Sequence, residues 1–537
     1  MPFGLLLQAL LIPIVSSPLL YYLGRSFGSK VASWLAFAVL VYSTLALVVG
    51  FQSGNPTSEN YLWFPRRLTG SPILSSIGNF GLYLDGISAP FAITVYAIAA
   101  PVVLFSVPYM KKRLHEEVGE AVSGGSQATL SIVGAETEVS ENRCEKSRYG
   151  LYLALSLLFS ASMVGTVLAT NLIELFFFFE FMLIPSYFLV SEFGYSNRAR
   201  VSMMFMLWTQ IGALVMLLAF LAIGTQTGSF VFIGSGAPSV VRIASGLIPW
   251  ITFGIVVGMF IKLAAFGLHV WLPSTYDEAP TPITALMSAA MTGMGGYVLI
   301  RTLVLLLPGE YIAIGIGLGV WGVVTMFYGG ILALAQDDFK KLLAYSSISQ
   351  MGYIIFGIAT ATQLGVAGSV FQFVSQATSK ALLFMVAGLI MVQAGGLKNM
   401  KGMGGLSTKL PVTSTCAMIG FLGLLGFPET NGFQSEWLIF GGGLQLVDQG
   451  GVVGAWWLVL SILAVIATVI TAAYALFAMK RIFFGRLPTE LSDLKEGSRY
   501  MLAPMIFLAA ITILLGILPS IIDNPLFATV SHLFPLG

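Results

Sequence analysis

The hydrophobic positions of this chain fall into long runs that are separated by short polar segments. Single runs reach about 20 residues, the length that an α-helix needs to cross the hydrocarbon core of a bilayer. A spanning barrel would show short alternating strands instead. The pattern therefore predicts an all-α polytopic membrane protein with about fourteen transmembrane helices, near residues 5–23, 30–50, 82–109, 150–169, 171–191, 202–224, 248–269, 280–306, 311–335, 341–361, 367–396, 411–443, 453–484 and 499–520.

The composition and the distribution of charge support a membrane protein. Only 9% of the 537 residues are charged, whereas a soluble domain carries about 25%, so a soluble protein is excluded. The first residues lack the basic start and cleavage site of a signal peptide, and we expect them to form the first span. The bases are scattered between apolar runs, which predicts no binding of nucleic acid.

Lysine and arginine lie mainly on one side of the predicted topology. Twenty of the 26 bases fall in or beside the loops after odd-numbered spans, and two, Lys262 and Lys380, fall inside spans. By the positive-inside rule, the odd loops lie in the cytoplasm and both termini lie outside. The four bases assigned to the other side are Arg66, Arg67, Arg242 and Arg301.

One segment departs from the apolar pattern, the polar stretch at residues 111–148 with many Ser, Gly and Glu residues. It is typical of a mobile surface loop. A docking site for a partner is the alternative.

Two predicted spans are interrupted at corresponding places in the two halves of the chain. The stretch "MFIKLAAFGLHVWLPSTYDEAPTP" places Lys262 before the first interruption, and "GLLGFPETNGFQSEWLIFGG" places Glu436 after the second. Irregular backbone at membrane depth persists only where it lines a cavity or packs on protein. Paired broken helices point to a transport site near the midplane of the bilayer.

Two carboxylates interrupt the phenylalanines of "NLIELFFFFEFMLIP", residues 171–185. We expect Glu180 to face Lys262, because a lysine in apolar surroundings releases its proton readily unless a carboxylate stabilises its charge. A purely structural ion pair is the alternative, although stability is a weak reason to keep one. Glu174 faces another direction, and it is either functional or a carboxylate that extends to the membrane interface.

Other polar residues in the predicted spans are open to two interpretations. Lys380 either carries protons, with water held beside it by Gln350 and Gln376, or extends its ammonium to the interface. His269 lies at the first interruption, where capping or packing competes with proton transfer. The stretch "AQDDFKKLLAYSS" at 335–347 predicts a solvated helix start with favourable charges for the helix dipole.

No cofactor or metal site is expected on this chain. Its two cysteines lie far apart, and its three histidines have no HxxxH spacing. We find no sequence that could hold flavin, nicotinamide or an iron–sulfur cluster, so the chain itself is expected to transfer no electrons.

The stretches "FFFFEFMLIPSYFLV", "FIKLAAFGLHVWLPSTYDEAPTP", "DDFKKLLAYSSISQMGYI" and "GFPETNGFQSEWLIFGG" resemble motifs of the antiporter-like proton-channel subunits of respiratory complex I. Mrp-type cation/proton antiporters and membrane-bound hydrogenases share this fold. The resemblance covers roughly residues 80–490. It implies two inverted five-helix repeats, broken helices 7 and 12, and half-channels that meet on a central polar axis.

The resemblance also implies roles and a division of the chain. Glu180, Lys262 and Glu436 match the family's ionisable residues on the fifth, seventh and twelfth helices, and a glutamate at position 436 is similar to subunit M. Gly293 stands where the family usually has a lysine, and Gln350 and Gln376 replace residues that are often histidine. The implied parts are the first three helices (1–110), a polar cytoplasmic loop (111–149), the first repeat (150–306), the second repeat (307–484) and a C-terminal helix and tail (485–537).

The expected function is proton translocation by Glu180, Lys262, Lys380 and Glu436, with His269 as a possible participant. The chain would be the membrane subunit of a complex I-like NADH (or other donor):quinone oxidoreductase, with the lipid bilayer and other membrane subunits as partners. We expect the prokaryotic cytoplasmic membrane, with a thylakoid or other energy-transducing membrane as the alternative. The other functions are an Mrp-type antiporter subunit, a membrane-bound hydrogenase subunit, or a scaffold with an inactive channel.

Overall fold

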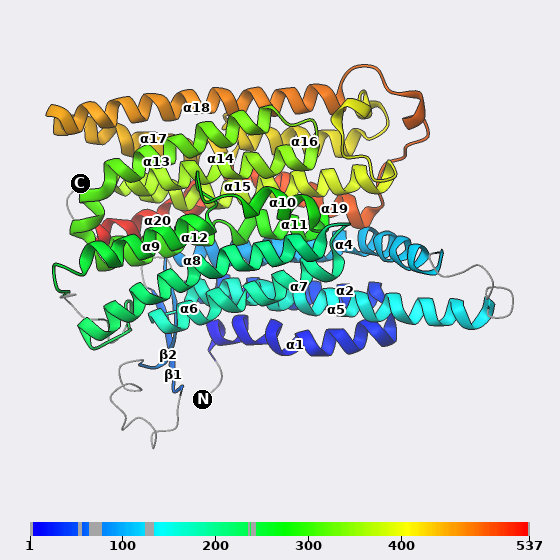
Figure 1. Ribbon diagram of the computed structural model, residues 1–537, viewed down its shortest axis with the longest axis horizontal. Helices are drawn as coiled ribbons and strands as arrows, with labels where there is room; N and C mark the ends of the chain where they lie inside the picture. The colour runs from blue at the N-terminus through cyan, green and yellow to red at the C-terminus, as the bar shows by residue number, and fades with distance from the viewer. Residues whose placement is uncertain are drawn as a thin grey trace.

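The computed structural model describes residues 4–51, 56–63, 78–123, 134–234, 237 and 243–534. Its helices run roughly parallel to the long axis of the molecule, and both chain termini lie toward the same end (Figure 1). The other end carries the α13–α14, α15–α16 and α18–α19 connections, with Lys340, Lys398, Lys401 and Arg481. We call it the basic end, and we call the end with the termini the terminal end.

The first half of the chain forms a short hairpin and a series of helices. Their bounds are α1 (Leu5–Phe27), α2 (Ser29–Gly50), β1 (Thr57–Tyr61), β2 (Phe80–Leu84), α4 (Ser88–Ser123), α5 (Gly134–Leu168), α6 (Leu172–Phe181), α7 (Leu183–Phe193), α8 (Arg198–Thr227), α9 (Ile248–Lys262), α10 (Trp271–Glu278), α11 (Thr281–Leu286), the π-helix η2 (Met287–Met291), α12 (Met294–Leu299) and the π-helix η3 (Ile300–Val304).

The second half contains the longest apolar helices. Its elements are α13 (Pro308–Leu334), α14 (Phe339–Ala359), α15 (Gln363–Gln393), α16 (Pro411–Leu424), α17 (Asn431–Gln445), α18 (Gly451–Phe483), α19 (Arg499–Ile517) and α20 (Ser520–Leu533), with 3₁₀ turns η4 (Met400–Gly402), η5 (Leu406–Thr408), η6 (Leu446–Gln449) and η7 (Thr489–Leu491).

The predicted spans agree with the helices. Within the described residues, twelve helical segments are long and apolar enough to cross a membrane. Two shorter apolar helices, α9 and α16, are the first parts of the two broken spans. Together they make up the predicted fourteen. The chain is thus an all-α, multi-pass membrane protein.

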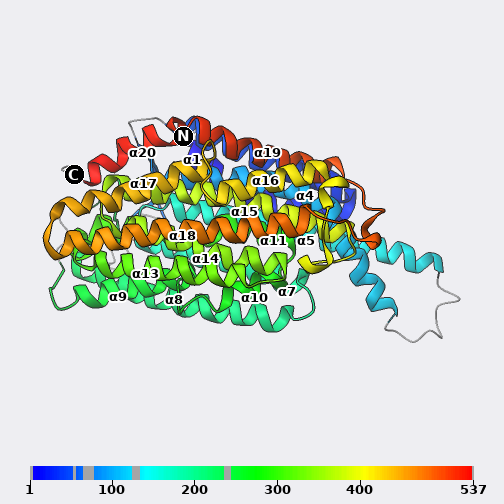
Figure 2. The ribbon, with the colours of Figure 1, turned by 90° about the horizontal axis from the view of Figure 1, so that it is seen from above.

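Some predicted boundaries are wrong. The third span begins at Ser88 rather than at residue 82, because residues 80–84 form β2, which pairs antiparallel with β1. After the last predicted span, the chain forms the additional helix α20. The polar segment at 111–148 is also not wholly a loop, since α4 continues to Ser123 and α5 begins at Gly134. These extensions project beyond the bundle (Figure 2).

Arg301 was assigned to the side opposite the cytoplasm, and the structure places it buried in η3, with 1% of its surface exposed. Its guanidinium pairs with Asp85 at 2.5 Å and donates a hydrogen bond of 3.1 Å to the Tyr297 hydroxyl. Asp85 also accepts hydrogen bonds from the backbone N–H groups of Ile87 and Ser88, at the start of α4. The charge is therefore retained because it is fully paired. Arg66, Arg67 and Arg242 lie outside the described residues.

Close helix packing relies on small residues, as is usual where helices meet in a membrane. On the α13–α14 contact, a Cβ atom at Gly322 would lie 2.9 Å from the backbone nitrogen of Phe356, and one at Gly352 would lie 2.6 Å from that of Met326. Only glycine permits this approach. The contact keeps α14, which carries part of the polar axis, firmly against α13.

Candidate functional site

The first broken span positions Lys262. Helix α9 ends at this residue, and the backbone then leaves helical geometry, with positive φ angles at Ala264 (52°) and Gly267 (84°). Lys262 is 2% exposed, and its ammonium lies 5.0 Å from the centre of the Phe179 ring. The sequence prediction of a lysine at a helix break is confirmed.

The backbone groups freed by this break have protein partners, as a break at membrane depth requires. The Trp271 indole donates a hydrogen bond of 2.8 Å to the carbonyl of Ile261. From α13, Trp321 donates to the Phe266 carbonyl at 3.0 Å, and the Thr325 hydroxyl accepts from the Phe266 N–H at 3.1 Å. Helix α13 therefore supports the break from outside the span.

Glu180 comes from α6, which ends one residue later; α7 then begins at Leu183. Its carboxylate interacts electrostatically with Lys262 and lies within reach of the Gln210 amide on α8. No ion pair within 4 Å links Glu180 and Lys262 among the described residues. The two opposite charges thus face each other at a distance that a small movement would change, which fits the predicted pairing.

Glu174 does not extend to the membrane interface, and that expectation was wrong. Its side chain is fully buried, and its carboxylate accepts hydrogen bonds from the N–H groups of Gly81 and Thr170 (both 3.3 Å) and from the Asn171 amide (3.2 Å). Asn171 in turn caps α6 by accepting from the Glu174 N–H at 2.8 Å. Glu174 therefore fixes β2 to the start of α6, where the helix dipole favours a negative charge.

His269 lies in the broken segment, half-buried, with its ring 4.8 Å from that of Tyr328 on α13. Its Nδ1 atom has no hydrogen-bond partner among the described residues. These contacts support the packing interpretation. None of these contacts offers His269 a group that could exchange a proton with its Nδ1 atom among the described residues.

The second broken span positions Glu436. Helix α16 ends at Leu424, α17 begins at Asn431, and Gly426 and Glu429 between them have positive φ angles of 68° and 71°. The carboxylate packs directly on Gly426, where a side chain would clash with it. Glu436 is 6% exposed, and among the described residues its Oε1 atom has no hydrogen-bond partner. A buried ionisable group therefore lies at each break.

Lys380 lies on α15 and is fully buried, which contradicts the alternative of an ammonium that extends to the interface. It donates hydrogen bonds to the carbonyl of Leu343, at 3.0 Å, and to the hydroxyl of Ser346, both on α14. No carboxylate pairs with it in the part of the chain that the structure describes. The ammonium is therefore stabilised only by neutral groups.

The glutamines do not surround Lys380 as predicted, because they bond elsewhere. Gln372 donates to the Gln350 side-chain oxygen at 2.5 Å and accepts from the Ser435 hydroxyl at 2.5 Å. Gln376 instead donates to the carbonyl of Ala289 at 3.1 Å. A row of side chains thus leads from α14 across α15 to the residue before Glu436. Gln372 was not singled out in the sequence. The signal that could have identified it is the presence of an amide side chain within an apolar helix.

Polar contacts also lead from the first break toward Lys380. The Tyr276 hydroxyl on α10 hydrogen-bonds Thr292, and Ser288 on η2 hydrogen-bonds Ser347 at 3.0 Å. Ser347 is the neighbour of the Ser346 that binds Lys380. None of these hydroxyl groups was singled out from the sequence, because isolated Ser, Thr and Tyr residues are common in helices.

Several buried polar atoms on this axis have no hydrogen-bond partner among the described residues. They are Gln376 Oε1, Ser379 Oγ, Glu436 Oε1, Ser461 Oγ and the Tyr474 hydroxyl, which faces Ser346 and Gln350. Buried polar atoms are normally satisfied by protein or by water. The second half of the axis therefore has the polarity needed to hold internal water.

Gly293 occupies the place where the resemblance leads one to expect a lysine. A Cβ atom there would clash with the Phe373 ring, which stacks on Phe91 with ring centres 4.1 Å apart. Tyr297 also packs edge-to-face against Phe91, with ring centres 5.1 Å apart. Aromatic side chains thus take up the space of the missing charge.

The expected solvated helix start at 335–347 is only partly correct. Asp338 caps α14, accepting from the N–H groups of Lys340 and Lys341 at 2.8 and 3.1 Å. Lys340, however, is only 1% exposed and binds the carbonyls of Asp277 and Ala279. A cavity of about 490 Å³ opens beside it at the basic end, lined by Asn197, Arg200, Val201, Met204, Pro273, Ser274, Asp277, Glu278, Gln336, Lys341 and Tyr345. Water can therefore approach α10 from this end.

The loops of the basic end are held by Asp337, which pairs with Lys401 at 2.5 Å and Arg481 at 2.8 Å. These hydrogen bonds hold the pKa of the Asp337 carboxyl below its usual range. Among the described residues, no group of three or more His, Cys, Asp or Glu could hold a metal ion.

A family model described as "NADH:quinone oxidoreductase/Mrp antiporter, TM" matches residues 169–471, which include both breaks and Glu174, Glu180, Lys262, His269, Lys380 and Glu436. The chain belongs to this family. It is 34% identical to F(420)H(2) dehydrogenase subunit M of Methanosarcina mazei over 380 residues, 69% of this chain and 73% of that protein. It is 27% identical to NADH-quinone oxidoreductase subunit M of Rickettsia typhi over 512 residues, 94% of this chain and 91% of that protein.

A solved structure of respiratory complex I from Thermus thermophilus contains a chain of the same fold. The TM-score is 0.77 at 23% sequence identity, over 98% of this chain and 99% of that chain. The resemblance seen in the motifs is thus confirmed for the fold and for the family. The roles of individual residues rest on the geometry described above.

Proposed function

We propose that this chain is the proton-translocating membrane subunit of a complex I-like oxidoreductase that passes electrons from NADH or another donor to a quinone. One observation carries the proposal: buried ionisable residues lie at both helix breaks, and a hydrogen-bonded row of polar side chains, Gln350–Gln372–Ser435, leads to the residue before Glu436. Ionisable residues inside a membrane are costly, and they mark proton relays in pumps and transporters. The names of the two relatives support the same class of complex.

The mechanism that we propose is electrostatic. Electron transfer elsewhere in the complex moves Glu180 toward or away from Lys262, and the lysine binds a proton when the carboxylate is near and releases it when the carboxylate withdraws. Because no close ion pair fixes the two groups, a small change of separation has a large effect on their interaction.

The released proton then moves toward Lys380 by way of the hydroxyl groups of Tyr276, Ser288 and Ser347, with water between them. From Lys380 it passes along Ser346 and the Gln350–Gln372–Ser435 row to Glu436. Amides and hydroxyls need internal water to pass a proton, and the unpaired atoms along this row supply places for it.

Glu436 leads to the terminal end through α17. Two residues earlier on the same helix, the Gln434 amide donates to Asp523 of α20 at 2.7 Å. Burial raises the pKa of the Asp523 carboxyl to about 6, although the bond from Gln434 opposes this. A carboxyl that titrates near neutral pH is suited to release a proton, and we propose that Asp523 does so at the terminal end. We propose that the terminal end faces away from the cytoplasm of a prokaryotic cell, as the distribution of bases indicates.

Lys262→Ala tests the proposal in the purified complex reconstituted into liposomes, with donor-driven proton uptake read from a pH-sensitive dye. We expect the protons moved per electron to fall while the subunit composition stays intact, because the charge that responds to Glu180 is gone. Lys495→Ala, an exposed lysine at the basic end, is the matched control. An unchanged proton yield in Lys262→Ala would leave the scaffold interpretation, which the Phe91–Phe373 packing favours.

An Mrp-type cation/proton antiporter is the second candidate, because the description of the matching family includes it. It would use the same residues with an ion gradient as the driving force. Replacing Na⁺ by choline in the proteoliposome assay separates the two, since only the antiporter requires Na⁺ for proton movement.

A further inference from the structure

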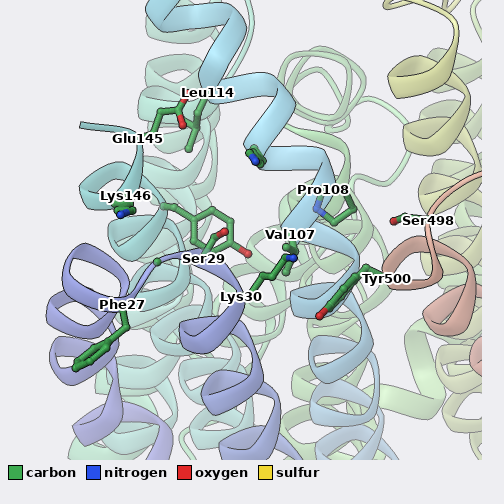
Figure 3. Close-up of a pocket in the computed structure, with 13 residues that line it drawn as sticks. Phe27, Ser29, Lys30, Val107, Pro108, Leu114, Glu145, Lys146, Ser498 and Tyr500 are labelled. Carbon is green, nitrogen blue, oxygen red and sulfur yellow. The ribbon is translucent and has the colours of Figure 1, made fainter. Parts of the chain in front are cut away.

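A pocket at the basic end lies between helices that the proposed proton path does not use. It is formed by the α1–α2 turn, the middle of α4, the start of the apolar part of α5 and the start of α19 (Figure 3). Its volume is about 510 Å³. The residues that line it are Phe27, Gly28, Ser29, Lys30, Val107, Pro108, Lys111, Leu114, Glu145, Lys146, Tyr149, Ser498 and Tyr500.

The polar groups of this pocket favour an anion. Lys30, Lys111 and Lys146 come from three different helices, and none of their ammonium groups has an ion pair among the described residues. The one carboxylate in the lining, Glu145, is engaged by His115 at 3.1 Å. The hydroxyl groups of Ser29, the first residue of α2, and of Ser498, the residue before α19, add hydrogen-bond donors.

A separate apolar groove begins about one helical turn farther along α4 and α19, at Leu104 and Ala503, and runs along α4 between α2 and α19. The part nearer the pocket, about 410 Å³, is lined by Phe37, Val41, Thr44, Leu45, Ala97, Ala100, Pro101, Leu104, Ala503, Pro504 and Phe507. Farther along the same helices lies a third space of about 370 Å³, which shares Ala97 and extends to Phe51 and Leu515. Leu45 and Phe507 are 56% and 47% exposed, so the groove is open at the side of the bundle.

The position of the pocket matches the headgroup level of a bilayer. Trp34 on α2 is 49% exposed and donates a hydrogen bond of 3.3 Å to the hydroxyl of Tyr500, which lines the pocket. Trp and Tyr are enriched at the membrane interface because their rings are apolar and their polar atoms reach water. Basic pockets between transmembrane helices bind anionic lipid headgroups.

We infer that this pocket and groove bind an anionic phospholipid, with its phosphate among Lys30, Lys111 and Lys146 and an acyl chain along α4 between α2 and α19. Charge complementarity distinguishes this occupant from a neutral lipid. The length of the groove distinguishes a phospholipid from free phosphate, because free phosphate has no acyl chain to occupy the groove.

The test uses the purified complex that contains the chain, washed in detergent and then incubated with vesicles of phosphatidylcholine containing about one fifth phosphatidylglycerol. Native mass spectrometry counts the lipid retained. The variant Lys30→Gln/Lys111→Gln/Lys146→Gln should lower the affinity for phosphatidylglycerol by about fivefold per lysine, or roughly 100-fold in total. The matched control is Lys409→Gln/Lys480→Gln/Lys495→Gln, which removes the same charge from exposed positions at the same end.

A second variant tests the groove separately. Ala97→Phe fills it without touching the lysines, and it should lower lipid retention at least about tenfold while the subunit composition is unchanged. Excess inorganic phosphate should not displace the lipid. Equal retention in the two triple variants, or full retention in Ala97→Phe, would overturn the inference. Displacement by phosphate would show a simple anion site, and cross-linking of Lys30 to a neighbouring subunit would show a protein occupant; either result overturns it.

Discussion

The two helix breaks hold their ionisable residues in different surroundings. At the first, Lys262 faces an opposite charge, Glu180, across a gap that no close ion pair closes. At the second, no cation pairs with Glu436 among the described residues, and the Gln350–Gln372–Ser435 row joins its helix to α14, which also holds the Ser346 that binds Lys380. The first arrangement responds to a change in distance, because Coulomb energy varies with separation. The second responds to the presence of a proton or water, because its polar atoms need a partner.

This difference accounts for the two charged side chains at the first break and the neutral amides and hydroxyls near the second. A site that senses movement needs two charges, whereas a site that conducts needs groups that donate and accept in turn. We therefore expect the first region to fail when a charge is removed and the second to fail when a hydrogen-bonding row is interrupted. The following predictions test this distinction.

The largest effect is expected for Glu180→Gln, compared with Glu174→Gln in the same segment. Removal of the Glu180 charge should lower donor-driven proton uptake by roughly 100-fold, a typical contribution of a positioned proton-transfer group. Glu174→Gln should leave transport within about twofold, because an amide oxygen still accepts from Gly81 and Thr170. Proteoliposome uptake measures both, and equal loss in the two variants would contradict the assignment.

Gln372→Leu should have a smaller effect, of about tenfold on proton uptake, because water can replace one link of the row between Gln350 and Ser435. Gln393→Leu, near the end of the same helix, serves as the control. A rate that depends on solvent deuterium in the wild type and more strongly in Gln372→Leu would support a proton-conducting row. An unchanged rate would remove Gln372 from it.

Gly293→Ala should affect stability rather than the chemistry. The added methyl group would clash with Phe373 and disturb its stack on Phe91, and overpacking of this kind costs about 1–3 kcal/mol. Gly309→Ala, where nothing lies within 4 Å, is the matched control. Thermal unfolding of the detergent-solubilised complex should separate the two variants, and equal melting temperatures would show that the aromatic cluster is loosely packed.

The smallest effect is a pH dependence at Asp523. Its pKa is raised to about 6 in the folded protein, so its contribution to stability is present below the unfolded pKa of about 4 and is lost as the pH rises through 6. Asp523→Asn should therefore melt at a higher temperature than the wild type at pH 8 and at nearly the same temperature at pH 4. A difference that does not change with pH would exclude titration of Asp523.

Much of this organisation could be predicted from the sequence because the cost of a charge in a membrane is high. Lys262, Glu180 and Glu436 were identified since ionisable residues in apolar runs are rare. The breaks were identified because glycine and proline interrupt helices. The pairing of Glu174 with Gly81, 93 positions away, was not predicted, because it depends on where β2 lies.

The central axis was predicted least well for the same physical reason. Gln372, Ser288 and Tyr276 carry no charge, so their presence in a helix costs less than that of a charge and gives a weaker signal in the sequence. Their hydrogen bonds to Thr292, Ser347, Gln350 and Ser435 form only when the chain has folded. Lys340 shows the opposite error, since its neighbouring Asp and Lys residues suggested solvent exposure, yet carbonyl groups of α10 and the following turn enclose it.

Helix α13 begins at Pro308, in the second half of the chain, and the helical segment from Thr281 to Val304 separates it from the first broken span. Its Trp321 and Thr325 nevertheless supply the partners for the backbone of Phe266, and its Tyr328 packs on His269. The two halves are therefore not interchangeable modules. If the chain were split before Pro308, the first half would lack the Trp321 and Thr325 partners of the Phe266 backbone and the Tyr328 ring that packs on His269.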